Sequence, residues 1–156
     1  MMNKIIVLLV VVITVLLTFW SMKSVEVIDV HMSDAGYSNI VVSHLPYTDK
    51  SRIEWWLENQ KGFEDKYKIP SPSKYGSYNI AVWGIGDGYI NFERNYKKDL
   101  YCFGDMKADK NCIEKNLLLT IRKGVDGKTI FTIGINGETY VLNGDEIVKV
   151  QKNKNW

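Results

Sequence analysis

Cys102 and Cys112 are the residues whose type and spacing point most directly to chemistry. An even, minimal cysteine count in an exported domain indicates one disulfide bond, and closing so short a loop stabilises a fold by about 3 kcal/mol in the chain-entropy treatment. Redox exchange and metal binding are the alternatives. Redox pairs usually lie two residues apart, and a zinc site would need two further ligands. We therefore expect a structural Cys102–Cys112 disulfide.

His31 and His44 are the only histidines, and thus the only ordinary candidates for a proton shuttle near neutral pH. We expect both at polar surface or strand-end positions, because no G-x-S-x-G motif accompanies them and both cysteines should be oxidised. No catalytic residue is assigned, and an enzyme is not expected. A hydrolase that uses paired carboxylates stays open, since such pairs are recognised by their separation in space.

Two further patterns resemble ligand sites, and each has a simpler explanation. The glycine-rich segment 84–88 would need a helix after it to hold a phosphate, but residues 89–92 have the pattern of a strand. Several oxygen-bearing side chains lie close in sequence without the order of a calcium-binding loop: Asp99, Asp105, Asp109 and Asn111. We expect a tight turn and a solvated loop, with no metal and no cofactor.

Aromatic side chains are the best candidates for binding a partner. Adjacent residues on a helix point about 100° apart, so Trp56 continues the apolar face of its helix while Trp55 is displaced from it. Trp55 therefore either covers the edge of the core or offers an exposed ring to a partner. Other aromatic residues could extend either role: Tyr75, Tyr78, Trp83 and Tyr89. The expected partner-binding set is Trp55, Tyr75, Trp83 and Tyr89.

The element that must position the two tryptophans is a helix. Apolar residues recur at helical spacing on one face, namely Ile53, Trp56, Leu57, Phe63 and Tyr67. Residues 51–54 have the form of a capping box, with Thr48 and Asp49 as alternative caps. Pro70 and Pro72 end the element, because proline lacks the backbone N–H. The sequence thus predicts one amphipathic helix.

Strands are predicted for much of the remaining chain. Alternating or apolar runs cover residues 25–30, 39–45, 78–83, 89–92, 117–122, 129–135, 138–142 and 147–150. The dipeptides Asp126-Gly127, Asn136-Gly137 and Asn143-Gly144 favour tight hairpins, which predicts an antiparallel C-terminal meander. The predicted fold class is α+β, with one main amphipathic helix on an antiparallel sheet of about five to seven strands.

Composition separates the first 24 residues from the rest. Residues 5–20 hold no charge, and a helix over residues 3–22 would be about 30 Å long, which just spans a bilayer. Of the 20 basic residues, 18 follow position 24, the exceptions being Lys4 and Lys23, and all 18 acidic residues follow it as well. The remainder of the chain is therefore formally neutral and has no basic stripe for nucleic acid.

The residues that border the apolar segment predict whether it is cleaved and how it is oriented in the membrane. A cleaved secretory signal is the alternative to a retained anchor, but no A-x-A-like cleavage site follows the segment. Lys4 and the terminal amine precede it, and Lys23 follows it, which favours a cytoplasmic N-terminus. We expect residues 1–24 to form an inner-membrane anchor that contacts lipid through residues 5–22. Residues 25–156 are expected to form one periplasmic globular domain.

Five separated motifs resemble those of a known family. They are IEWWLEN at 53–59, KYKIPSP followed by Tyr75-Gly76, GDGY at 86–89, CFGDMK at 102–107 and NCIEKN at 111–116. Over about residues 1–123, the chain resembles an enterobacterial family of short, single-span, membrane-anchored proteins classed as a domain of unknown function. The resemblance implies one span followed by a globular part. It implies no activity and no catalytic residue.

These observations lead to one expected function and one alternative. We expect a non-catalytic, membrane-tethered module that binds another envelope protein, an immunity protein being one version. The alternative is a hydrolase that acts on an envelope polymer through carboxylates. A deep cleft with two inward acids near His31 or His44 would favour the enzyme. A flat aromatic patch remote from any cleft would favour binding.

Overall fold

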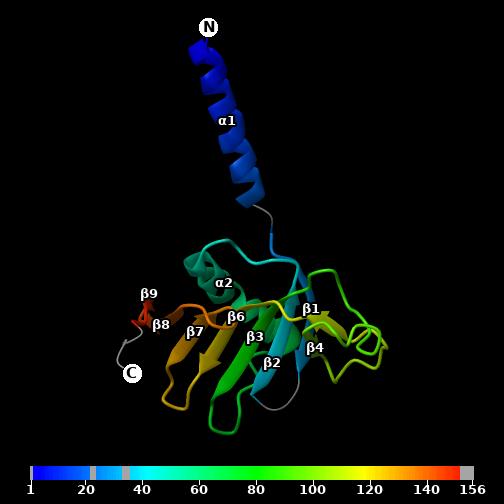
Figure 1. Ribbon diagram of the computed structural model, residues 1–156. Coiled ribbons are helices and arrows are strands. Elements are labelled where there is room, and N and C mark those ends of the chain that lie inside the picture. The colour runs from blue at the N-terminus through cyan, green and yellow to red at the C-terminus, as the bar shows by residue number, and fades with distance from the viewer. Residues whose placement is uncertain (1, 22–23, 33–35, 152–156) are drawn as a thin grey trace.

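The computed structural model describes residues 2–21, 24–32 and 36–151 of the 156-residue chain. Helix α1 (Met2–Ser21) projects from a sheet domain that contains the other described elements (Figure 1). The expected lipid-contacting segment 5–22 is thus helical as far as Ser21, and residue 22 lies outside the described residues. Over the described residues, none of the helices combines the length and the apolar character needed to span a bilayer.

Helix α2 (Asp49–Tyr67) forms where the helical periodicity predicts it. Its N-cap is Thr48, whose side-chain oxygen accepts a hydrogen bond from the backbone N–H of Ser51, while the Ser51 hydroxyl oxygen accepts one from the Thr48 N–H. The capping box is therefore present, and it begins at Thr48, one of the alternative caps. The helix ends at Lys68, which has a left-handed φ of 59°.

Seven strands form the main sheet, in the order β1-β2-β3-β6-β7-β8-β9. Their bounds are β1 Val27–Met32, β2 Tyr37–Val42, β3 Tyr78–Gly84, β6 Leu117–Lys123, β7 Thr129–Ile133, β8 Thr139–Asn143 and β9 Glu146–Lys149. Two short strands, β4 (Leu100–Cys102) and β5 (Cys112–Glu114), make a separate small sheet. The α+β class is as predicted.

The prediction of a purely antiparallel sheet is wrong at one place. β2 and β3 are parallel, with Tyr37 opposite Asn79 and Val42 opposite Gly84. The connection between them explains the pairing, because α2 carries the chain back along the sheet before β3 begins, as in a strand–helix–strand crossover. The meander from β6 to β9 is antiparallel, as predicted.

The predicted strand at residues 89–92 is also wrong. Only Ile90 pairs there, in an isolated bridge with Cys112. The chain turns away from the main sheet after Gly84 and returns to it at Leu117. We call the intervening residues 85–116 the lobe. Gly86 and Gly88 both have positive φ, so the expected tight turn at 84–88 is present and starts the lobe.

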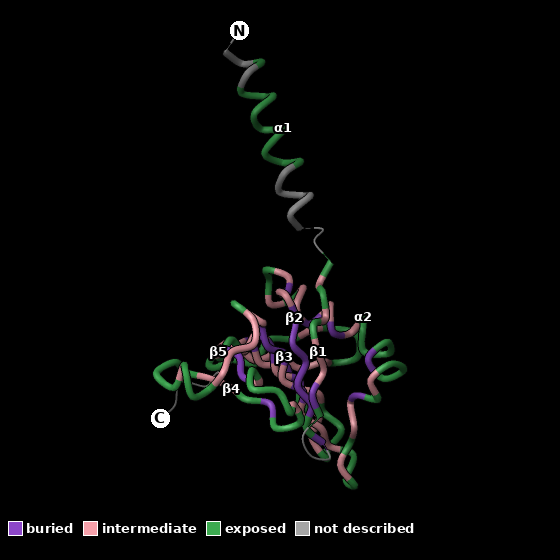
Figure 2. The backbone as a smooth tube through the Cα atoms, turned by 90° about the vertical axis from the view of Figure 1, so that its right-hand side faces the viewer, coloured by how far each residue is buried: buried purple, intermediate pink, exposed green. Residues whose placement is uncertain are grey.

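The main hydrophobic core lies between α2 and one face of the sheet. Ile53, Trp56 and Phe63 of α2 are buried there, Trp56 at 1% exposure. The strand side chains that meet them are Ile40, Val42, Ile80, Val82, Leu119, Ile121, Phe131 and Ile133. Buried residues therefore line the central strands, as the tube in Figure 2 shows for β2 and β3.

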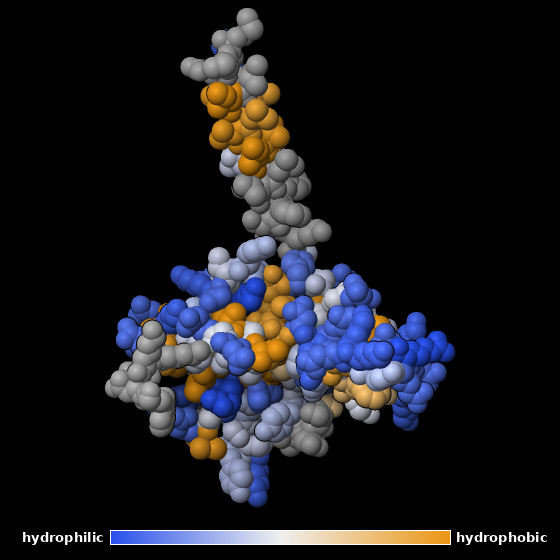
Figure 3. All heavy atoms as spheres, viewed as in Figure 1, coloured by the Kyte–Doolittle hydropathy of each residue, from blue (hydrophilic) through white to orange (hydrophobic). Residues whose placement is uncertain are grey.

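The opposite face of the sheet is only partly covered. A smaller core forms where the lobe packs on it, from the buried residues Val41, Trp83, Phe103 and Ile113. Successive strand residues point to opposite faces, so β2 and β3 are buried on both sides at their lobe end. We call the part of this sheet face that the lobe leaves uncovered the open face. In the view of Figure 3, hydrophobic residues gather in the middle of the domain and hydrophilic residues border them.

Candidate functional site

The lobe is closed by the predicted disulfide. Cys102 and Cys112 lie directly opposite each other on β4 and β5, with their Cα atoms 3.9 Å apart, and they are bonded. The bond closes the mostly polar segment 103–111 into a loop. Phe103 and Met106 are the exceptions in that segment, since Phe103 is buried against the sheet and Met106 packs partly buried against the same core.

We expected His31 at the polar surface or at a strand end. The polar-surface part of this expectation is wrong. His31 is near the end of β1, as expected, but only 3% exposed. Its ring stacks on Phe103 of the lobe, with ring centroids 3.9 Å apart. Its Nδ1 lies 3.0 Å from each carboxylate oxygen of Asp105, and its Nε2 lies 2.9 Å from the Tyr89 hydroxyl oxygen. Asp105 was expected in a solvated loop, but its carboxylate contacts His31 of β1.

Tyr89 completes a chain of contacts between β1 and the lobe. Besides its contact with His31, its hydroxyl donates to Asp29 Oδ2 at 3.5 Å. Burial, and then the nearby carboxylates of Asp29 and Asp105, raise the pKa of Tyr89 well above its usual value. A tyrosine with a raised pKa is a proton-bearing donor and a poor nucleophile. This arrangement fastens the lobe to the sheet.

Two acids lie near His31, but their carboxylates are partly exposed and neither lines one of the two hollows described next. Asp29 and Asp105 both flank the ring, at 3.6 Å and 3.0 Å. The ring itself is covered by the lobe, and neither of the two hollows described next is lined by it. His44 lies just after β2, where its Nδ1 is 2.9 Å from the Ser43 hydroxyl oxygen.

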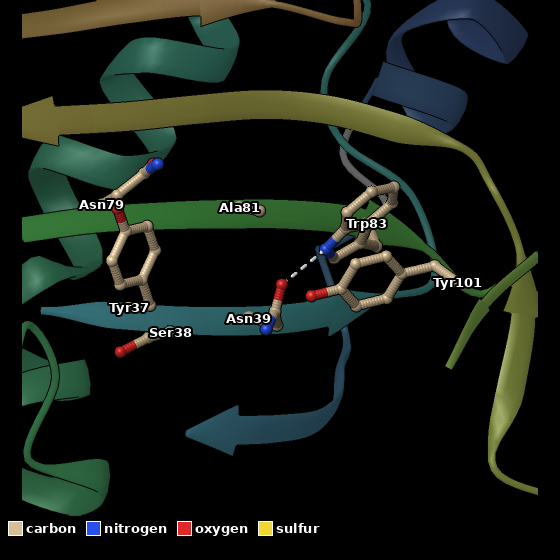
Figure 4. Close-up of a pocket in the computed structure, with 7 residues that line it drawn as sticks. All are labelled: Tyr37, Ser38, Asn39, Asn79, Ala81, Trp83 and Tyr101. Atoms are coloured by element: carbon tan, nitrogen blue, oxygen red, sulfur yellow. Dashed lines mark hydrogen bonds between the residues drawn. The ribbon is translucent and has the colours of Figure 1, made fainter. Parts of the chain in front are cut away.

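The first hollow has a volume of about 170 Å³ and lies on the open face beside the lobe (Figure 4). It is lined by Tyr37, Ser38, Asn39, Asn79, Ala81, Trp83 and Tyr101. Tyr37 lies at one end and the stacked rings of Trp83 and Tyr101 at the other, with Ala81 between them. Trp83 Nε1 donates a hydrogen bond to Asn39 Oδ1 at 2.9 Å. We call this site the amide hollow.

The second concavity is larger and lies between α2 and the β8–β9 hairpin. Its volume is about 600 Å³, and it is lined by Lys50, Glu54, Leu57, Asn143, Asp145, Glu146 and Ile147. Lys50 and Glu54 form an ion pair at 3.6 Å. Tyr140 of β8 donates to Asp49 Oδ2 at 2.8 Å, which ties the hairpin to the start of α2. We call this site the acidic groove.

The four expected partner-binding residues do not form one patch. Tyr75 is 69% exposed, but Trp83 is buried at 7% and belongs to the smaller core. Tyr89 bonds to His31, and Trp55 packs half-buried against the main core, with its ring edge-on to Phe63. Trp55 thus covers the edge of the core, which is one of its two expected roles.

Sequence reasoning missed the amide hollow and the acidic groove. One signal was available for Trp83, because Ala81-Val82-Trp83 is continuously apolar, a pattern typical of a strand buried on both faces. No such signal joins Asn39 to Asn79, or α2 to residues 143–147. Among the described residues, no group of three or more His, Cys, Asp or Glu side chains could hold a metal ion.

Comparison with known proteins adds one positive finding. A family model described as "Enterobacterial putative membrane protein (DUF943)" matches residues 1–151. The match includes the five motifs noted in the sequence and extends beyond residue 123 through the C-terminal meander. No curated protein and no solved structure matches the chain.

Proposed function

The chain belongs to this enterobacterial family of membrane proteins, and from that premise we propose that it is a membrane-anchored, non-catalytic module that binds another protein of the bacterial envelope. The acidic groove is the observation on which this proposal rests. The partner it fits is a protein that presents an apolar side chain flanked by basic ones. An immunity protein that neutralises a toxin in the envelope would be one such module.

The lining of the groove supports this choice of partner. Leu57 and Ile147, both packed half-buried against the main core, give it an apolar floor. The Glu54 carboxylate is paired with Lys50, whereas Asp145 and Glu146 have no ion-pair partner among the described residues. Three carboxylates and one ammonium therefore surround the floor. Such a negative, partly apolar concavity attracts a basic segment and gains from burying an apolar one.

The size of the groove also suits a peptide segment. A volume of about 600 Å³ lies in the range of sites that enclose several side chains or a small molecule. The groove is framed by a helix and a hairpin that Tyr140 and Asp49 join, so its two walls are connected. Sites held by regular elements lose less conformational freedom on binding than sites on loops.

The location of the module rests on the anchor and the disulfide. We place residues 1–24 in and beside the inner membrane, with lipid contact through residues 5–22 and the N-terminus in the cytoplasm. The uncharged run at residues 5–20 and the membrane description of the family support this placement. The Cys102–Cys112 disulfide supports a periplasmic domain, because disulfides persist in oxidising compartments and are rare in the cytosol.

The groove is tested by photo-crosslinking in intact cells with the full chain. A crosslinking residue at Asn143, which lines the groove, should join the chain to one protein identified by mass spectrometry. The double variant Asp145→Lys/Glu146→Lys should remove that adduct. Purified partner should bind the full chain in detergent, and binding should weaken about 10-fold or more in this variant, since close charge pairs at interfaces couple by about 1.5 kcal/mol or more.

A matched control separates the groove from general charge. Glu58→Lys/Asp65→Lys makes the same change of net charge at two exposed positions of α2 that do not line the groove. This variant should keep the adduct. Loss of the adduct in both double variants, or the same adduct from a crosslinker at exposed Gln60, would contradict a groove-specific partner.

A further inference from the structure

The outer edge of β9 presents backbone groups that no described strand uses. β9 is the last strand of the main sheet, at the end opposite to β1 (Figure 1). Just after β9, the backbone N–H of Val150 donates to the Thr139 carbonyl of β8. Residues that pair through the backbone alternate along an antiparallel ladder with residues that do not. The N–H and C=O groups of Ile147 and Lys149 therefore point away from β8, toward the free edge.

The other edge of the main sheet is protected against the addition of a strand. β1 has a register shift between Val27 and Asp29, and the Asp29 carboxylate accepts a hydrogen bond from the Val30 N–H at 2.8 Å. Bulges and charged side chains at an edge are common means of preventing further pairing. β9 pairs with β8 in a regular register, and the ammonium group of its lysine, Lys149, is held by Glu138 at 3.4 Å. Of the two edges, β9 is thus the one that can accept another strand.

The acidic groove lies beside this free edge. Ile147 lines the groove and packs against the main core, so its side chain points to the α2 side of β9. In an antiparallel pair, residues directly opposite each other project to the same face. A residue opposite Ile147 on an added strand therefore projects into the groove, toward Leu57 of α2. An added strand would thus be the partner of the groove, and its assignment rests on the proposed function.

The side chains along the edge define the sequence that an added strand should have. Asp145 and Glu146 have no ion-pair partner among the described residues, so the residues opposite them should be basic. Ile147 and Val148, the latter 37% exposed, favour apolar residues opposite them. Lys149 favours an acidic one. Read along an antiparallel strand, the matching order is acidic, apolar, apolar, basic, basic.

A second copy of this chain matches the edge less well. Two copies paired through β9 would be related by a two-fold axis, which leaves each side chain on its own face of the sheet. Glu146 could then face Val148 or Val150 of the copy, but never Lys149, which projects to the opposite face. In those registers the Glu146 carboxylate lies opposite an apolar side chain. A segment of a different protein can place a basic residue there.

We propose that the partner of the acidic groove binds as an extended segment that adds antiparallel to β9, with the order acidic, apolar, apolar, basic, basic. Strand addition of this kind draws affinity from backbone hydrogen bonds and specificity from alternate side chains. The segment pairs through its backbone with Ile147 and Lys149, and its second apolar side chain enters the groove beside Leu57. Its two basic residues lie opposite Glu146 and Asp145, and its acidic residue lies opposite Lys149.

The probe is a synthetic peptide with blocked ends and the sequence threonine–glutamate–valine–valine–lysine–lysine–threonine. It is titrated into the full chain in an uncharged detergent and followed by NMR, with an expected Kd of about 0.1–1 mM. Binding should slow hydrogen exchange at the Ile147 and Lys149 N–H groups, and less at the Val148 N–H, which already pairs with β8. Unchanged exchange at Ile147 and Lys149, or no binding up to about 10 mM, ten times the weakest expected Kd, would overturn the proposal.

Two isomers of the peptide separate backbone pairing from charge and composition. N-methylation of the second valine removes an N–H that faces Ile147, so the affinity should fall about 10-fold or more. N-methylation of the first valine removes an N–H that points away from β9 and should change the affinity by less than about 2-fold. Equal affinities of the two isomers would overturn strand addition. A peptide with glutamate and lysine exchanged should bind about 10-fold more weakly or worse, and equal binding would overturn the assigned order of charges.

A proline variant of the chain separates this inference from the proposed function. Lys149→Pro removes an outward N–H, which an edge strand tolerates because β8 does not use it. Lys149→Ala keeps that N–H and is the matched control. Only the proline variant should lose the peptide and the adduct of the crosslinker at Asn143 in cells. An adduct that Lys149→Pro keeps and Asp145→Lys/Glu146→Lys loses would overturn strand addition and leave the groove partner standing.

Two further outcomes assign the edge. Binding that distinguishes the two isomers, with no adduct in cells, would support the strand site and contradict the envelope partner alone. Dimers of the full chain in detergent that Lys149→Pro dissociates and Lys149→Ala keeps would give the edge to a second copy and overturn the proposal. Sedimentation of the full chain at increasing concentration detects such dimers.

Discussion

The two faces of the main sheet are covered by different means. On one face, α2 packs Ile53, Trp56 and Phe63 into a continuous apolar core. On the other, the lobe contributes a smaller core and depends on local ties, which are the Cys102–Cys112 bond and the contact of His31 with Asp105. Stability from a large apolar area is lost only when the domain unfolds. Stability from local ties can be lost while the rest of the domain stays folded.

The largest effect should come from the α2 face, with Trp56→Ala. Trp56 is 1% exposed and stacks on Phe63 at 5.6 Å, so its removal leaves a large cavity. We expect a loss of about 3–5 kcal/mol in the free energy of unfolding. Urea denaturation of the full chain in detergent measures it. Trp55→Ala, at the half-buried edge of the same core, should lower the free energy of unfolding clearly less. An equal loss in both variants would contradict the assignment of Trp56 to the core and of Trp55 to its edge.

The second-largest loss in the free energy of unfolding should come from the lobe, in the double variant Cys102→Ala/Cys112→Ala. Opening the loop should cost about 3 kcal/mol in the chain-entropy treatment. We expect hydrogen exchange to speed up first in the lobe, for example at the Phe103 N–H, which donates to the Asn111 carbonyl. Amides of β6 and β7 should keep their protection. Uniform loss of protection over both faces would show that the lobe has no independent stability.

A smaller effect should come from the contact between His31 and Asp105. The double-mutant cycle of His31→Ala and Asp105→Ala should give a coupling of about 1–2 kcal/mol, because one partner is buried and the other is a carboxylate. Asp109→Ala is the matched control in the same loop, where the carboxylate is exposed. A coupling near zero would mean that the disulfide and Phe103 hold the lobe without His31.

The comparison of the two faces also explains what the sequence could predict. α2 and the C-terminal hairpins follow from local patterns, namely a helical repeat with a cap and dipeptides such as Asn143-Gly144. The main core follows from them, because an amphipathic helix must cover an apolar sheet face. The disulfide follows from a cysteine count.

The lobe face was harder to predict because its contacts join residues far apart in the chain. His31 and Asp105 are 74 positions apart, and although Asp105 lies in the motif at 102–107, nothing in the sequence pairs it with His31. Trp83 and Tyr89 were expected to meet a partner, but Trp83 lies on the face of β3 that the lobe covers, and Tyr89 belongs to the lobe and contacts His31. The amide hollow depends on a small residue, Ala81, between larger ones, and hydropathy patterns carry no signal for such a gap.

The smallest effect concerns alkaline pH, and it should differ between the faces. The pKa of Tyr89 is raised by burial and by Asp29, so on raising the pH the unfolded chain loses this proton before the folded one does. The stability linked to Tyr89 is therefore complete below about pH 10 and decreases as the pH rises above that value. Tyr89→Phe removes the hydroxyl, so its stability should fall less steeply between about pH 9 and 11.

Tyr140→Phe provides the comparison on the α2 face. The bond to Asp49 raises the pKa of Tyr140 in the same direction, but its hydroxyl is more exposed to solvent than that of Tyr89. Because solvent weakens the effect of a charge on an exposed group, this variant should change the pH slope less than Tyr89→Phe does. Urea midpoints measured across that pH range decide between them. Equal slopes in the native chain and in Tyr89→Phe would show that the hydroxyl of Tyr89 is not buried against Asp29.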